Sequence, residues 1–211
     1  VDLRRDATDN GSIINAVTLD PATLRPTPFT DVYEVPQRAF RVSPRVDYQL
    51  TEAHSLTFRY GVTRMDVPGA GIGGFNLSSR GYDAFTRTDT VQASDTAVMG
   101  AHLLNELRFQ YFRSAFSQQP FSDAPAVIVS GAFSGGGAQT GVSSNLENNY
   151  EFQDYLSATR GSHTFRFGVR WRTTLADNVS RQNFGGTFTF GGSTGPELDA
   201  ADQPVPGTMM N

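Results

Sequence analysis

The feature that most constrains this chain is the strict alternation of apolar and polar residues in several short segments. Between Leu56 and Thr63 (LTFRYGVT) every second residue is apolar, and the residues between them are polar or glycine. The same pattern recurs between Phe165 and Arg172 (FRFGVRWR). A period of two puts all the apolar side chains on one face of an extended strand. The chain is therefore expected to fold into antiparallel β-strands that each have one apolar and one polar face.

The expected fold class is all-β, an antiparallel meander that forms part of a transmembrane β-barrel, with about six to eight strands and long extracellular loops. Residues 1–38 contain four prolines and little periodicity, which predicts an irregular lead-in segment. Residues 39–191 are the expected barrel segment, and residues 192–211 are the expected irregular tail of a truncated chain. The strands are expected over 40–50, 56–63, 86–94, 106–111, 150–159 and 165–172, with a short piece over 187–190.

The connections between these strands alternate in length. Short turns are expected over 51–54, 99–103 and 160–163, whereas the connections over 66–84 and 117–149 are long and rich in glycine. The apolar run 126–129 inside the second long connection predicts a small strand or a patch that packs inward. Alternating short turns and long loops are typical of outer-membrane barrels.

An apolar sheet face needs a covering layer, and the sequence offers no amphipathic helix to provide one. No run of eighteen apolar residues is present, so a membrane-spanning helix is not expected. Lipid is the covering layer that fits the pattern, and an open sheet cannot satisfy its edge hydrogen bonds in lipid. We therefore expect this chain to be part of a larger barrel, with a soluble β-sandwich as the alternative.

The alternation assigns side chains to the two faces of the expected sheet. The polar face, which would look into the barrel, carries many arginines, and the apolar face would meet lipid. The expected lumen-facing residues are Arg45, Arg59, Arg108, Arg166, Arg170 and Arg172. The expected lipid-facing residues are Leu56, Phe58, Tyr60, Leu107, Phe109, Tyr111, Phe165, Phe167 and Trp171.

Nothing in the composition points to an enzyme or a nucleic-acid binder. The net charge is −4, all 17 basic residues are arginine, and no basic run occurs. Gly69, Gly71 and Gly74 match a dinucleotide fingerprint in spacing, but no buried strand precedes them and no helix follows. The three histidines lie near expected turns without metal-ligand spacing, and there is no cysteine. We expect no catalytic residues, no cofactor and no metal.

Four phrases resemble the barrel of TonB-dependent outer-membrane receptors, in particular the Oar-like kind. They are RVDYQLTEAHSLTFRY (45–60), NELRFQYFR (105–113), RGSHTFRFG (160–168) and NFGGTFTF (183–190). The resemblance implies a location in the cell outer membrane and energised uptake of an unknown ligand. It also implies a plug domain, the TonB complex and outer-membrane lipid as partners, in a barrel of about 22 strands. A surface-exposed structural or adhesive β-protein and a soluble carbohydrate-binding β-sandwich are the alternatives.

Overall fold

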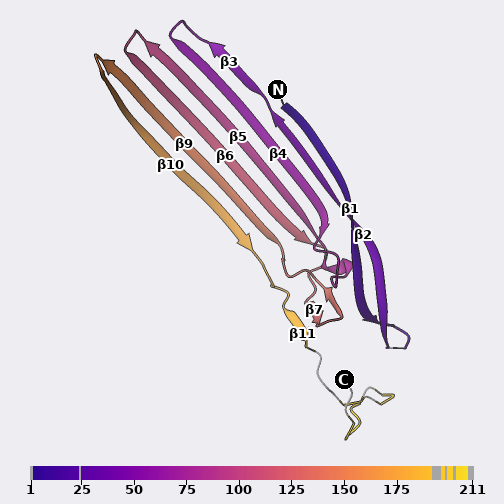
Figure 1. Ribbon diagram of the computed structural model, residues 1–211. Helices are drawn as coiled ribbons and strands as arrows, with labels where there is room; N and C mark the ends of the chain where they lie inside the picture. Colours follow the sequence, from indigo (N-terminus) through magenta and orange to yellow (C-terminus); the bar gives the residue numbers. More distant parts are fainter. Residues whose placement is uncertain (1, 24, 192–195, 198, 202, 209–211) are drawn as a thin grey trace.

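The chain forms one long, curved antiparallel sheet with a small second sheet at one end (Figure 1). This computed structural model describes residues 2–23, 25–191, 196–197, 199–201 and 203–208. Neighbours in sequence are neighbours in the sheet, so the topology is a meander. The expected fold class, an all-β antiparallel meander of six to eight strands, is confirmed.

The large sheet has the order β1-β2-β4-β5-β6-β9-β10, and β3 extends β2 along the edge of β4. The small sheet has the order β11-β7-β8, with β11 parallel to β7. The elements of the large sheet are β1 (Asp2–Leu19), β2 (Pro26–Ser43), β3 (Arg45–Gln49), β4 (His54–Ala70), β5 (Tyr82–Met99), β6 (Leu103–Pro120), β9 (Ser143–Arg160) and β10 (His163–Ser180). The remaining elements are β7 (Ala126–Val129), β8 (Phe133–Gly136), β11 (Thr187–Phe190) and the short 3-10 helix η1 (Ser78–Arg80).

Three short turns lie at one end of the sheet, and the long connections lie at the other end together with the turn between β1 and β2 (Figure 1). The short turns join β3 to β4, β5 to β6 and β9 to β10, as the sequence predicts. The connections after β4 and β6 are the long ones, again as predicted, and the loop after β6 contains β7 over the predicted apolar run. The strand β8 in the same loop was not predicted.

The strands are much longer than the alternating segments that reveal them. Four of the long strands, β5, β6, β9 and β10, have 18 residues each, a length of about 60 Å. A transmembrane strand needs only about 9–11 residues. In β9 the half nearer the long loops carries polar side chains on both faces, as at Asn145, Asn148 and Asn149. The outer half of β1 instead carries apolar side chains on both faces, as at Ile13 and Ile14. Alternation is lost in both cases, which is why the sequence does not reveal these halves.

The prediction of an irregular lead-in over residues 1–38 is wrong, because β1 and β2 form a continuous hairpin from Asp2↔Ser43 to Leu19↔Pro26. The prolines of β2 lie at positions where a backbone N–H would have no hydrogen-bonding partner. The amides of Asn15 and Val17 in β1 point away from β2, toward carbonyls in the long loops. The β2 residues opposite these odd positions likewise point away from β1.

The prolines of β2 therefore lie on a free strand edge. Pro26, Pro28 and Pro36 all face odd positions of β1, and β2 pairs with β4 only over Arg38–Val42. Proline is tolerated at a strand edge because its missing N–H has no partner there, and it also blocks pairing with another chain. A residue type that signals irregular structure in sequence is here part of a regular hairpin.

The long connection predicted over residues 66–84 is shorter than expected, since β4 continues to Ala70 and β5 begins at Tyr82. The register shifts between Val67 and Ala70, which marks a β-bulge containing Pro68 and Gly69. Gly69 has a φ of 71°, a backbone conformation that glycine adopts without strain. The expected loop over 117–149 is shortened in the same way by the ends of β6 and β9.

The long loops pack against the hairpin and against one another. Ile14 and Ala16 of β1 are buried together with Ile72 of the loop after β4, and Tyr33, Leu77 and Phe133 pack around them. Within the described part of the chain, no helix is long and apolar enough to cross a membrane. Much of the predicted irregular tail lies outside the described residues, and its described residues between 196 and 208 are irregular, with turns at 200–201 and 206–207 and a β-bridge at Pro204.

Candidate functional site: the two faces of the sheet

The strand register brings all six of the predicted polar-face arginines to one face. Residues that are paired across neighbouring strands lie on the same face of the sheet. One row of such paired residues crosses the sheet through five successive strand pairings. This row is Arg45, Arg59, Gln92, Gln110, Glu151 and Arg172. Arg108 and Arg170 lie in the adjacent row with Ser94 and Gln153, and Arg166 lies on the same face nearer the short turns.

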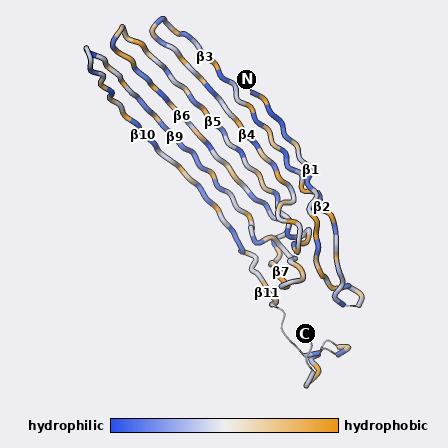
Figure 2. The backbone as a smooth tube through the Cα atoms, in the orientation of Figure 1, coloured by the Kyte–Doolittle hydropathy of each residue, from blue (hydrophilic) through white to orange (hydrophobic). Residues whose placement is uncertain are grey.

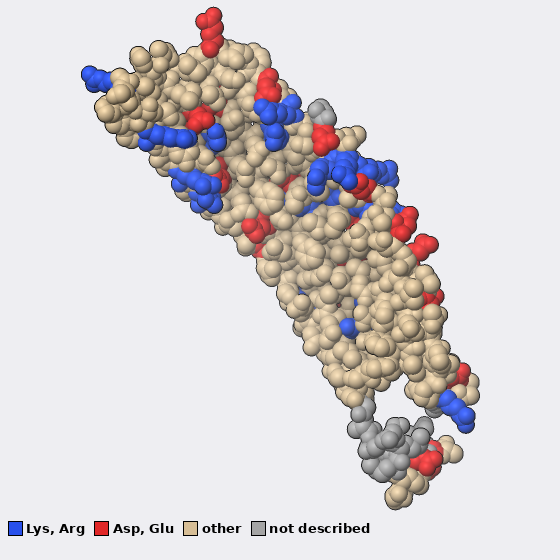
Figure 3. Space-filling view, in the orientation of Figure 1, with Lys and Arg blue, Asp and Glu red and all other residues tan. Residues whose placement is uncertain are grey.

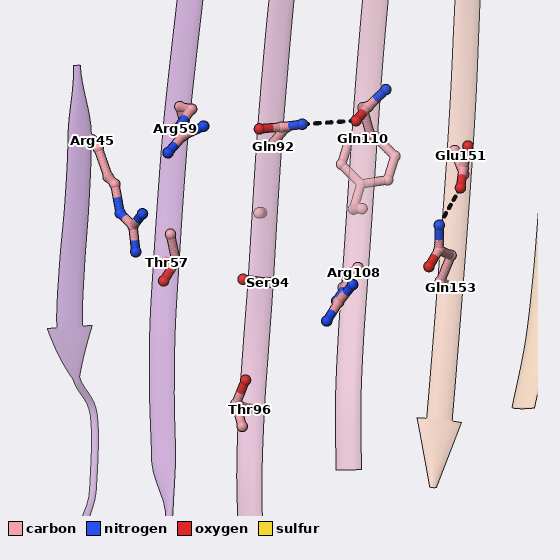
Figure 4. A pocket seen from close by; sticks show the side chains of 12 residues that line it. Arg45, Thr57, Arg59, Gln92, Ser94, Thr96, Arg108, Gln110, Glu151 and Gln153 are labelled. Atoms are coloured by element: carbon pink, nitrogen blue, oxygen red, sulfur yellow. Dashed lines mark hydrogen bonds between the residues drawn. The ribbon is translucent and has the colours of Figure 1, made fainter. Parts of the chain in front are cut away.

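A shallow hollow of about 410 Å³ lies over the middle of this polar face. Figure 4 shows the side chains of Arg59, Gln92 and Gln110 side by side on β4, β5 and β6. The short side chains of Thr57, Ser94 and Thr96 lie in the neighbouring rows. Gln92 donates to the Oε1 of Gln110 at 2.8 Å. Most of the lining side chains carry hydrogen-bonding groups, and Ala93 and Phe109 are the apolar residues among them. A mainly polar lining suits a hydrophilic occupant.

Five of the six arginines share three carboxylates. Arg45 pairs with Asp47 at 2.8 Å. Glu106 accepts from Arg108 at 2.8 Å and Arg166 at 3.2 Å. The sequence analysis did not single out Glu151, which contacts Arg170 at 2.6 Å and Arg172 at 3.5 Å. Oppositely charged side chains accordingly lie next to one another over this half of the sheet (Figure 3).

Arg59 differs from the other five arginines. Among the described residues it forms no ion pair within 4.0 Å, although Arg45 is its direct cross-strand partner. Five of the six predicted arginines therefore have a carboxylate partner on this face, and Arg59 has none among the described residues. An anionic group entering the hollow would meet Arg59 first without displacing an existing carboxylate.

The predicted apolar residues all lie on the opposite face. One row runs from Phe58 through Ala93, Phe109 and Phe152 to Trp171. These side chains are exposed, with Phe58 at 49% and Trp171 at 54%. Hydrophobic and hydrophilic residues accordingly alternate along the long strands (Figure 2). The apolar rows extend over about nine residues of each strand, which matches the length needed to cross a bilayer.

A row of tyrosines marks one border of this apolar belt. Tyr60 is opposite Val91, which is opposite Tyr111, which is opposite Tyr150. The rings of Tyr111 and Tyr150 are 5.0 Å apart, and the Tyr60 hydroxyl donates to Asp89 at 2.8 Å. Tyrosines with an apolar ring and a hydrogen-bonded hydroxyl form the aromatic girdles of outer-membrane barrels. The sequence analysis did not predict this row, because the tyrosines lie on three different strands.

Two carboxylates interrupt the apolar belt nearer the short turns. Asp95 contacts the Nδ1 of His54 at 2.8 Å, and Asp154 accepts from the amide of Asn105 at 2.7 Å. Each carboxylate thus has a neighbouring hydrogen-bonding side chain on an adjacent strand. In the part of the chain that the structure describes, no cluster of His, Cys, Asp and Glu could hold a metal ion.

The long loops form a second hollow of about 320 Å³, lined by Asp123, Arg181, Asn183 and Phe184. The loop after β6 is held against η1 by Arg80, which is 9% exposed and donates to the carbonyl of Gly137 and to Gln139. Burial lowers the pKa of Arg80. The glycine-rich stretch 69–74 is part of this region and lies between β4 and η1, not between a strand and a long helix.

The fold and its two faces are those of a membrane-spanning antiparallel sheet. A family model described as outer membrane beta barrel domain matches residues 12–208, so the chain belongs to this family and is located in the cell outer membrane. No curated protein matched the chain, and no solved structure did.

Proposed function

We propose that this chain is a segment of the barrel of a TonB-dependent receptor that takes up a ligand across the outer membrane. In this proposal the apolar face meets lipid and the arginine-rich face lines the barrel interior. The observation that carries the proposal is the hollow on the polar face with its unpaired Arg59. A barrel that served only as a scaffold would not require an unpaired guanidinium in such a hollow.

The long loops support the same proposal. They fold over the outer end of the β1–β2 hairpin around Ile14 and Ile72 and enclose the second hollow. Ordered loops that carry a hollow suit capture of a ligand from outside. The partners under this proposal are outer-membrane lipid, a plug domain, the TonB complex and the ligand, with no nucleic acid and no enzymatic role.

Among the alternatives, the soluble carbohydrate-binding β-sandwich is inconsistent with membership of an outer-membrane barrel family. A surface-exposed structural or adhesive β-protein differs from the proposal in its energy requirement. Uptake against a gradient stops when the inner membrane loses its proton gradient, whereas adhesion does not.

The test compares uptake in cells that carry the intact gene, a deletion of the gene, or a deletion of TonB. The probes are labelled ferric chelates, cobalamin, oligosaccharides and peptides. We expect uptake of one probe class to be lost in both deletions and in the presence of a protonophore. Unchanged uptake of every probe, together with lost surface attachment in the gene deletion alone, would support the adhesive alternative.

A single substitution tests whether the hollow on the polar face takes part in uptake. Arg59→Gln in the full-length protein is expected to lower uptake of the responsive probe at least several-fold, because it removes the unpaired guanidinium. Arg25→Gln is the matched control, since it removes the same charge from the exposed turn between β1 and β2. Equal uptake by both variants would show that the hollow is not on the transport path.

A further inference from the structure

Three arginines lie together on the apolar-belt face, just beyond the tyrosine row. Arg64 of β4 is the direct cross-strand partner of Arg87 of β5. Arg113 of β6 is opposite Asp89, two residues along β5 from Arg87. These three residues, here called the outer arginine cluster, therefore occupy adjacent positions on three neighbouring strands. The side chains of Arg64 and Arg87 are 57% and 51% exposed, and Arg113 is exposed as well.

The position of the cluster along the strands corresponds to a particular depth in a membrane. Arg113 lies two residues beyond Tyr111, or about 7 Å along the strand, and Arg64 lies four residues beyond Tyr60, or about 14 Å. Strands in outer-membrane barrels are tilted by about 35–45°, which reduces these distances to heights of about 5–6 Å for Arg113 and about 10–11 Å for Arg64. The headgroup layer adds about 5–8 Å on each side of the hydrocarbon core. Arg113 therefore lies within this layer, and Arg64 lies at its outer border, from which a long side chain can reach the phosphates.

The cluster carries more positive charge than its neighbours neutralise. Asp66 pairs with Arg64 at 3.0 Å, and Asp89 pairs with Arg87 at 2.9 Å. Arg113 forms no ion pair within 4.0 Å among the described residues. The other charged residues in these rows of the same face are Arg5, Arg38 and Asp177. Like charges placed directly opposite on adjacent strands are destabilising unless an anion lies between them.

We propose that the outer arginine cluster binds phosphate groups of lipid headgroups in the outer leaflet of the membrane. Guanidinium groups bind phosphate oxygens with paired, charge-assisted hydrogen bonds. Asp66 and Asp89 hold Arg64 and Arg87 from the side through Nε and one terminal nitrogen each. The remaining guanidinium donors are left for an external anion. The proposal rests on the apolar face meeting lipid, but it does not depend on TonB-driven uptake.

The experiment measures lipid binding to the full-length protein by native mass spectrometry in detergent. The probes are a bisphosphorylated glycolipid, its dephosphorylated form and phosphatidylglycerol. We expect the bisphosphorylated glycolipid to bind, the dephosphorylated form to bind at least tenfold more weakly, and the variant R64Q/R87Q/R113Q to lose that preference. If phosphatidylglycerol binds as tightly, the site recognises any phosphate headgroup; equal binding of the dephosphorylated glycolipid overturns the proposal.

The matched control R59Q/R108Q/R170Q removes the same charge from the opposite face of the sheet and is expected to retain the preference. A separate measurement reports whether the apolar face meets lipid at all. The fluorescence of Trp171 is the emission that the variant Trp171→Phe loses. Lipids brominated in their acyl chains should quench this fluorescence. If Trp171 is quenched but R64Q/R87Q/R113Q keeps the lipid preference, phosphate binding by the outer arginine cluster is refuted. If Trp171 is not quenched, contact of the apolar face with lipid is refuted.

Discussion

Arg80 shows how one buried residue organises the outer loops. It is the one charged side chain among the buried residues that the structure describes, and its Nε has no hydrogen-bond partner there. Its other guanidinium nitrogens donate to Gly137 and Gln139 in the loop after β6. A buried cation is costly unless its donors are used, so these two contacts hold the glycine-rich loop in a defined position. No pattern in the sequence points to this role, because Arg80 follows two serines in a glycine-rich segment.

Replacing Arg80 by alanine is expected to free the loop without unfolding the sheet. Loss of the two hydrogen bonds should lower the free energy of local opening by about 1–3 kcal/mol, which corresponds to roughly 5- to 150-fold faster amide exchange over residues 134–141. Hydrogen–deuterium exchange of the reconstituted protein measures this. The control Arg25→Ala changes an exposed arginine and should leave exchange in that loop unaltered. Equal exchange in both variants would mean that the loop is held by its backbone contacts alone.

Within the strand β10, the alternating pattern of polar and apolar residues does not explain why Gly168 is a glycine. Gly168 occupies a polar-face position opposite Tyr155, and a Cβ there would collide with the tyrosine ring. The ring of Tyr155 lies across the glycine, with the guanidinium of Arg166 4.8 Å from its centroid. An aromatic side chain that covers a strand glycine compensates for the missing side chain. The sequence predicts the strand and its faces, but it does not reveal which aromatic residue covers Gly168.

Gly168→Ala is expected to destabilise the sheet by about 1–3 kcal/mol, because the ring of Tyr155 must move. Gly61→Ala is the matched control, since a Cβ at Gly61 would meet Thr90 at an ordinary contact distance of 3.9 Å. Urea unfolding of the protein in lipid vesicles, followed by heat-modifiable gel mobility, gives both stabilities. A larger loss for Gly61→Ala than for Gly168→Ala would contradict this account of the pair.

Across the whole molecule, the sequence predicts the half of each strand that crosses the membrane and misses the half that does not. Alternation is present where one face is apolar, as around Phe58 and Phe167, and is absent where polar residues lie on both faces, as at Asn145 and Asn148. The register places the six predicted arginines on one face of the sheet and the nine predicted apolar residues on the other, while the assignment of these faces to the lumen and to lipid remains a prediction. The hairpin β1–β2 was missed because its prolines lie on an unpaired edge, a property that depends on how far β2 pairs with β4.

The border between the two halves can be located by labelling. A cysteine at Phe152, within the apolar belt of β9, is expected to resist a water-soluble maleimide in intact cells. A cysteine at Leu146, on the same face of β9 but beyond Tyr150, is expected to react. The chain contains no cysteine of its own over these residues. Labelling at both positions would place the membrane border nearer the short turns than the tyrosine row.

The outer halves of the strands also bear on how proteins of this kind diverge. A residue there needs neither to enter hydrocarbon nor to fit a narrow apolar belt, so few substitutions are excluded beyond those that prevent a strand. The wall above the membrane is held mainly by backbone hydrogen bonds, which do not depend on side-chain identity. It can therefore accumulate changes rapidly under attack by phages or antibodies while the belt below it preserves insertion.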